Sequence, residues 1–78
     1  MHVEVRLFAT LREGRFNRRT LDLPEGTSVG GLLERLAIPP GVPGRHVILP
    51  LVNGRHAKPD QPLADGDIVA IFPAVAGG

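Results

Sequence analysis

The residues with the clearest chemical potential stand at the end of the chain, where residues 73–78 are Pro-Ala-Val-Ala-Gly-Gly. Six extended residues reach about 20 Å, and glycine passes a narrow channel because it has no Cβ. An α-carboxylate is ionised at neutral pH and is a poor electrophile. The Gly78 carboxylate would therefore need activation, for instance adenylation, before acyl or sulfur transfer. The alternative is a frayed end of small residues, because termini are often loosely held.

Other chemistry finds little support in the sequence. The chain has no cysteine, which excludes disulfides, a thiol nucleophile and thiolate metal sites. His2, His46 and His56 are scattered, so we expect no metal site. Neither a nucleophile elbow nor a phosphate-binding Walker loop is present. We therefore expect that another protein activates the terminus.

Length and composition indicate one small globular domain of 78 residues. The formal net charge is +1, with acids and bases interspersed, which argues against a nucleic-acid partner. No apolar run is long enough to span a bilayer, and the first residues lack a signal-peptide core. We expect a cytoplasmic protein that binds neither nucleic acid nor membrane.

The first half of the chain predicts a hairpin. Residues 2–9 alternate, with Val3, Val5, Leu7 and Ala9 on one face, which is typical of a half-buried strand. Phe8 falls on the polar face, where it either covers a second small core or belongs to a docking surface. Residues 12–19 form a predicted loop rich in arginine, either solvated or facing an acidic partner. Residues 20–23 predict the return strand.

A short amphipathic helix follows. Thr27 or Ser28 is the predicted N-cap, and Val29, Leu32, Leu33 and Leu36 have helical spacing. Gly30 and Gly31 weaken a helix, so we expect close packing there against a sheet. Pro39 and Pro40 are predicted to end the helix.

The second half predicts three more strands. After a proline- and glycine-rich connection at residues 39–45, residues 47–52 form a strand in which Pro50 indicates an edge or a bulge. Asn53-Gly54 predicts a hairpin turn with a return strand at 55–58. Asp65-Gly66-Asp67 offers too few oxygens for a cation and predicts a turn. Residues 68–72 are apolar on both faces, as in a central strand, and Pro73 should end the sheet. The whole is an α+β fold.

The last sixteen residues are similar to the C-terminal signature of the MoaD/ThiS family of sulfur carriers. The similarity lies in Asp65-Gly66-Asp67, Phe72-Pro73 and Gly77-Gly78 at this spacing. Leu7-Phe8-Ala9, Arg12-Glu13 and Val52-Asn53-Gly54 resemble weaker motifs of the MoaD branch. The resemblance implies a single domain, residues 1–78, with a ubiquitin-like β-grasp of four to five strands on one main helix and a flexible tail at 73–78.

The same resemblance implies a function. The chain would be the small subunit of molybdopterin synthase, carrying sulfur as a thiocarboxylate on Gly78 for a pterin precursor in molybdenum or tungsten cofactor synthesis. It would not be an enzyme alone and would bind no cofactor. Expected partners are a MoeB-like adenylyltransferase that uses ATP, a sulfurtransferase and a MoaE-like large subunit carrying the catalytic residues.

The resemblance also suggests residue roles. Val75, Ala76 and Gly77 would form the inserted tail, while Phe8, Phe72, Pro73 and Leu63 would contact the partner. Phe8 and Phe72 would lie together as an exposed apolar patch, because the first and last strands of a β-grasp are parallel neighbours. Alternatives are a ThiS-like carrier for thiamine thiazole synthesis, a ubiquitin-like protein modifier and an interaction module with a frayed tail.

Overall fold

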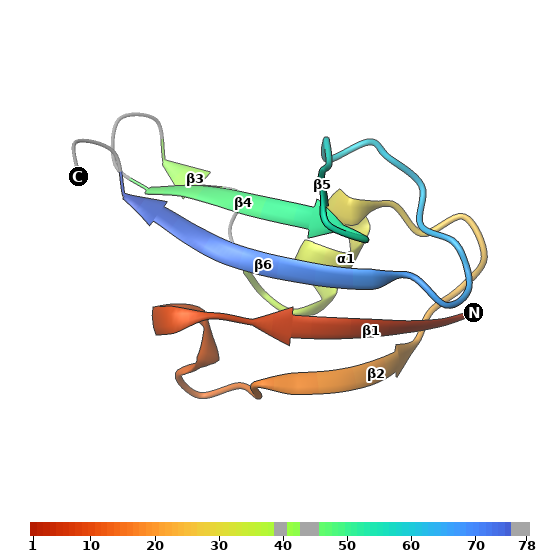
Figure 1. Ribbon diagram of the computed structural model, residues 1–78, viewed down its shortest axis with the longest axis horizontal. Coiled ribbons are helices and arrows are strands. Elements are labelled where there is room, and N and C mark those ends of the chain that lie inside the picture. Colours follow the sequence, from red (N-terminus) through yellow and green to blue (C-terminus); the bar gives the residue numbers. More distant parts are fainter. Residues whose placement is uncertain (39–40, 43–45, 76–78) are drawn as a thin grey trace.

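The computed structural model describes residues 1–38, 41–42 and 46–75. In these residues the chain forms six strands, a 3-10 helix and one α-helix (Figure 1). In chain order they are β1 (His2–Leu7), η1 (Ala9–Arg12), β2 (Arg18–Asp22), α1 (Val29–Arg35), β3 (Gly41–Val42), β4 (His46–Val52), β5 (Arg55–His56) and β6 (Ile68–Val75).

The strands form one mixed sheet in the order β2-β1-β6-β4-β3, with β5 paired to β4. Strands β1 and β6 run parallel in the centre, and every other pairing is antiparallel. Helix α1 covers one face of this sheet (Figure 1). The predicted α+β architecture is confirmed. The sheet has one strand more than predicted, because β3 lies inside the segment expected to be a plain connection.

The core lies between α1 and the covered face of the sheet. Alternate residues of β1 and β6 point into it, and Val3, Val5, Val69 and Ile71 are fully buried. Complete burial of each such side chain stabilises the fold by about 1.5–3 kcal/mol. The prediction that Ala9 joins this face is wrong. Strand β1 ends at Leu7, and Ala9 is exposed with φ 54° at the start of η1.

The predicted loop at residues 12–19 is partly structured. Its first residue closes η1, and β2 already begins at Arg18. Between them the Arg15 guanidinium donates to the carbonyls of Leu36 and Ala37, at 3.3 and 3.2 Å, and to that of Leu11 at 3.3 Å. A cation at a helix C-terminus is favourable because it faces unpaired carbonyls and the negative end of the helix dipole.

Helix α1 begins and ends with side-chain and backbone caps. Ser28 is the N-cap, and its hydroxyl accepts from the Gly31 amide at 3.1 Å. At the other end Ala37 has φ 56°, its amide donates to Glu34, and the Ile38 amide donates to Leu33. This is a Schellman motif, in which glycine usually occupies the left-handed position. The helix therefore stops at Arg35; the predicted stop residues, Pro39 and Pro40, lie outside the described residues.

Gly30 packs closely, but against a loop and not against the sheet as predicted. Its amide donates to the Pro59 carbonyl at 2.8 Å, and a Cβ at Gly30 would lie 3.1 Å from that oxygen. A Cβ at Gly31 would meet only ordinary contacts at 3.4 and 3.5 Å. Packing therefore requires a glycine at position 30 but not at position 31.

Pro50 occupies a local gap in the sheet. Strand β4 pairs with β6 without a break in register, so no bulge is present. On its other side β4 pairs with β3 at His46 and Val47 and with β5 at Leu51 and Val52. The Pro50 carbonyl accepts from Ala57 on this second side, so its nitrogen also faces that side. A residue with an N–H here would return a bond to the Ala57 carbonyl, so proline forgoes one ladder bond at the place where β5 has already ended at His56.

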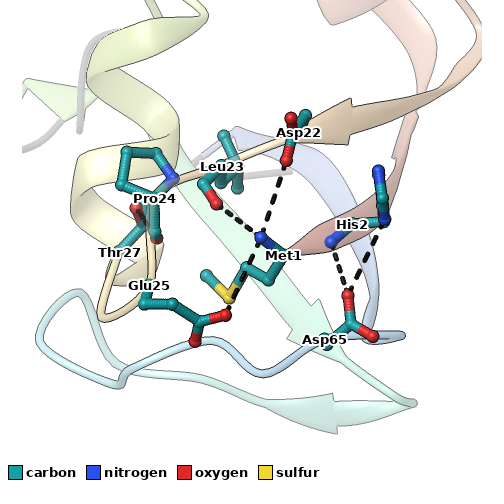
Figure 2. A network of polar contacts seen from close by, with 8 residues as sticks. All are labelled: Met1, His2, Asp22, Leu23, Pro24, Glu25, Thr27 and Asp65. Carbon is teal, nitrogen blue, oxygen red and sulfur yellow. Dashed lines mark hydrogen bonds and ion pairs between the residues drawn. The ribbon is translucent and has the colours of Figure 1, made fainter.

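The loops at the start of β1 are held by polar contacts (Figure 2). The Met1 ammonium donates to the Leu23 carbonyl at 2.8 Å, with carboxylate oxygens of Asp22 and Glu25 at 3.5 and 3.9 Å. Asp65 accepts from the His2 amide at 2.6 Å, and Gly66 turns with φ 87°. The predicted turn at residues 65–67 is confirmed.

Asp67 and Asn53 fasten the same end of the sheet. One Asp67 carboxylate oxygen accepts from the Ala64 amide at 2.8 Å and the other from the Asn53 side chain at 2.9 Å. Asn53 and Gly54 have φ 52° and 82°, as in the predicted type I′ hairpin turn. The return strand after it is shorter than predicted, because β5 covers only Arg55–His56.

Candidate docking face and C-terminal tail

Phe8 and Phe72 form the centre of the site. Strands β1 and β6 are parallel, with Leu7 opposite Ile71, and the Phe8 amide donates to the Ile71 carbonyl at 3.2 Å. Phe8 and Phe72, which directly follow Leu7 and Ile71, therefore lie side by side. The two rings stack with centroids 4.2 Å apart and planes 10° from parallel. The predicted juxtaposition is confirmed, but both rings are half-buried and not fully exposed.

The stack belongs to the sheet face that α1 leaves uncovered. Directly opposed residues of neighbouring strands share a face, and the register pairs Leu49 with Phe72 and Leu51 with Ala70. Ile68, two and four residues before Ala70 and Phe72, is a large apolar side chain that is 38% exposed. We call Phe8, Leu49, Leu51, Ile68 and Phe72 the apolar face. An uncovered apolar surface of this kind is typical of a protein-binding site.

Strand β6 continues beyond the stack, contrary to the prediction that Pro73 ends the sheet. Pro73 lies opposite Ile48, and Val75 lies opposite His46. The Ile71 carbonyl faces β1, and alternate residues of a strand face the same side, so the Pro73 nitrogen also faces the β1 side. Strand β1 has ended at Leu7, and the next carbonyl, that of Phe8, accepts from the Leu11 amide instead. Proline is tolerated because its missing donor has no partner to lose.

Pro73 is half-buried, and Val75 is the last described residue of β6. Ala76, Gly77 and Gly78 lie outside the described residues, so their predicted roles remain predictions. The pairing of β6 with β4 extends to Val75, so residues 73–75 of the predicted tail lie in the sheet.

Leu63 does not belong to the docking face. Its side chain is 5% exposed and part of the core, and its amide donates to the Thr27 carbonyl at 2.9 Å. The bridge between Ser28 and Pro62 holds this segment against the start of α1 and turns Leu63 inward. This burial argues against the predicted contact with a partner, which stays a prediction. That role was suggested with the family resemblance, and nothing in the local sequence shows the bridge.

The described residues show no metal centre and no membrane-crossing helix. No group of three or more histidine, aspartate or glutamate side chains in ranges 1–38, 41–42 and 46–75 could hold a metal ion. Helix α1 has seven residues, and none of the helices described is long and apolar enough to cross a membrane. The structure places the aromatic stack at the end of the sheet from which β6 leads toward the C-terminus, and the apolar face runs from the stack along β6 to Ile68.

The comparisons with known proteins agree with this arrangement. A profile of the ThiS family matches residues 5–78, whereas a search of curated proteins finds no match. A Pyrococcus furiosus protein assigned as molybdopterin converting factor subunit 1 is 31% identical, with a TM-score of 0.75 over 96% of this chain and 99% of that one.

Two further structures are similar along their whole length. SAMP1 from Haloferax volcanii is 29% identical, with a TM-score of 0.75 over 100% of both chains. A chain of the Helicobacter pylori protein complex between subunits 1 and 2 of molybdopterin-converting factor is 27% identical, with a TM-score of 0.64 over 100% of both chains. With the family profile covering almost all of it, this chain belongs to the ThiS family of ubiquitin-like sulfur carriers with the β-grasp fold.

Proposed function

We propose that this chain is the small subunit of a molybdopterin synthase and carries sulfur as a thiocarboxylate on Gly78. The observation that supports this most is the Phe8–Phe72 stack on the uncovered face, at the end of the sheet from which β6 leads to the terminus. A docked partner that covers the stack receives the C-terminal residues at a fixed place. The similarity to molybdopterin converting factor subunit 1 along nearly the whole chain supports the pterin pathway.

The chemistry needs two steps on the Gly78 carboxylate. In the first, a carboxylate oxygen attacks the α-phosphate of ATP on a MoeB-like adenylyltransferase, and pyrophosphate leaves. In the second, the outer sulfur of a persulfide on a sulfurtransferase attacks the acyl carbon and displaces AMP, and a thiol then reduces the S–S bond of the acyl disulfide, which releases the thiocarboxylate. The chain contributes an accessible terminus and no catalytic side chain; a MoaE-like large subunit supplies those for transfer to the pterin precursor.

Reconstitution tests this proposal directly. The chain is prepared with a chemically installed C-terminal thiocarboxylate, which bypasses activation, and mixed with the large-subunit homologue of its source organism and the pterin precursor. We expect the dithiolene product by mass spectrometry, in an amount set by the thiocarboxylate added. A chain with one alanine added after Gly78 is the matched control. Equal product from the two chains, or none from either, contradicts the proposal.

A second candidate function is protein modification. It is favoured by the similarity to the Haloferax volcanii small archaeal modifier protein 1, at 31% identity over 95% of this chain. An activated Gly78 acyl group would then form an amide with a lysine of another protein. Incubation of the chain with ATP and an extract of its source organism distinguishes the two. Gly78-linked conjugates on lysines support modification, and free thiocarboxylate chain without conjugates supports sulfur transfer. A ThiS-like role predicts transfer to a thiazole precursor and no complex with the large subunit.

A further inference from the structure

Positive charge is concentrated at the end of the sheet where β1 stops. Five of the nine lysine and arginine residues lie within residues 6–19, where Glu13 is the one acid. Two of the five serve the fold, because Arg15 caps α1 and Arg19 lies 4.8 Å from the centre of the Phe16 ring. The other three surround a shallow hollow beside the stack, which is lined by Arg6, Leu7, Phe8, Arg12, Asn17 and Arg18.

Positively charged arginine side chains lie close together in the hollow. Arg6 and Arg18 are directly opposed in the antiparallel pair of β1 and β2. The Leu7 amide bonds to the Asn17 carbonyl, so the neighbouring Arg6–Arg18 pair is of the non-hydrogen-bonded kind, in which side chains are closest. Like charges in this position destabilise a sheet. Arg6 bonds to Glu4, but no carboxylate of the described residues is within ion-pair distance of Arg12 or Arg18.

The opposite end of the same strands is acidic. Asp22, Glu25 and Asp65 surround the start of β1 (Figure 2), and Asp22 is the β2 partner of His2. The five residue steps from His2 to Leu7 separate the two ends by about 17 Å. The chain is thus polarised along β1, although its net charge is only +1. Its basic end is the end toward which β6 runs.

We infer that the basic hollow receives carboxylate side chains of the protein on which the apolar face docks. The inference rests on the proposed function. Phe8 belongs to both the stack and the lining of the hollow, so one partner surface spans both. That surface has an apolar centre and an acidic rim, which is the usual anatomy of a protein interface. A nucleic-acid partner fits less well, because acidic residues at the opposite end of β1 balance the positive charge and because the hollow borders an apolar stack.

Complementary charge at a rim acts mainly on the rate of association, which it accelerates through steering. In the complex of this chain with such a partner, complementary charge also orients the chain. The acidic rim of the partner attracts the basic end of the chain and repels its acidic end. The C-terminal segment of β6 is then directed toward the partner at first encounter. Removing the charge should slow association strongly at low salt and weakly at high salt, because a screening length of about 3 Å at 1 M suppresses steering.

Stopped-flow association with the large-subunit homologue of the source organism tests the inference. We compare the native chain, Arg12→Glu, Arg18→Glu and the matched control Arg55→Glu, which makes the same charge change on exposed β5. Arg12→Glu and Arg18→Glu should each reduce the association rate by about tenfold at low salt. The reduction should disappear near 1 M salt, and the Arg55→Glu rate should match the native rate. Circular dichroism verifies that each variant is folded.

Three outcomes overturn the inference. If the native chain binds the large subunit and both hollow variants associate at the Arg55→Glu rate, the hollow is not a docking element, and the proposed function stands. If the native chain forms no complex, the proposed function fails and the inference with it. If the chain binds polyuridylate through Arg12 and Arg18 while large-subunit association is unchanged, the hollow is a phosphate site.

Discussion

Replacing Phe72 with alanine should weaken docking while the domain remains folded. Full burial of a phenylalanine side chain is worth about 1.5–3 kcal/mol. Phe72 is largely buried in the free chain, with at most about a third of it exposed, so we assign at most about a third of this, roughly 0.5–1 kcal/mol, to the docked complex. The dissociation constant should rise about 2- to 5-fold, since about 1.4 kcal/mol is a factor of ten. Phe8→Ala with Phe72→Ala should raise it about 5- to 30-fold.

The same substitution costs some stability. The buried part of the ring, about two thirds or more, contributes roughly 1–2 kcal/mol, and the stack with Phe8 about 0.5–1.5 kcal/mol. A domain of 78 residues has a free energy of unfolding of about 4–12 kcal/mol, so most of the Phe72→Ala protein stays folded. Urea unfolding followed by circular dichroism measures this loss.

Isothermal titration with the large-subunit homologue measures the docking effect. Phe16→Ala is the matched control, because Phe16 is also half-buried and packs against the core, but it lies in the connection before β2 beneath Arg19. It should lower stability and leave the dissociation constant unchanged. The reasoning is refuted if Phe16→Ala and Phe72→Ala weaken the complex equally, because the loss would then follow stability and not contact with the partner.

Three further predictions concern the fold that supports this face. Gly30→Ala should destabilise the domain by about 1 kcal/mol, because its Cβ would press on the Pro59 carbonyl oxygen, whereas Gly31→Ala should stabilise it by about 0.5–1 kcal/mol; urea unfolding of the two variants should show opposite signs. Arg15→Ala should cost about 1 kcal/mol through loss of the α1 C-terminal cap, and Arg15→Lys, which keeps the charge but not the fork of donors, should recover only part of it in thermal unfolding. Ala37→Gly should stabilise by about 0.5–1 kcal/mol because Ala37 has φ 56°, and an unchanged or lower melting temperature contradicts the Schellman assignment.

The sequence predicted what depends on local patterns. The alternation of Val3, Val5 and Leu7, the Ser28 cap and the Asn53-Gly54 turn each carry a short-range signal, and the structure confirms all three. The stack of Phe8 on Phe72 was also predictable, but only through the family resemblance, because it depends on pairing the first strand with the last.

The differences from prediction that bear on the site concern contacts between distant segments. Leu63 is buried because Pro62 bridges to Ser28, and Arg15 is a helix cap because η1 lies beside the end of α1. Pro73 remains in the sheet because β1 has already stopped on the side that its nitrogen faces. No local sequence pattern shows at which residue the neighbouring strand of a sheet ends.

The central claim is that the Gly78 carboxylate is the group on which chemistry occurs. Intact mass spectrometry after incubation with ATP, an adenylyltransferase, a sulfurtransferase and a sulfur source measures it most directly. We expect the chain to gain the mass difference of one sulfur-for-oxygen exchange, located by fragmentation at Gly78, and the chain with an added C-terminal alanine to gain none. An unchanged mass of the native chain, or the same gain in both chains, contradicts the account.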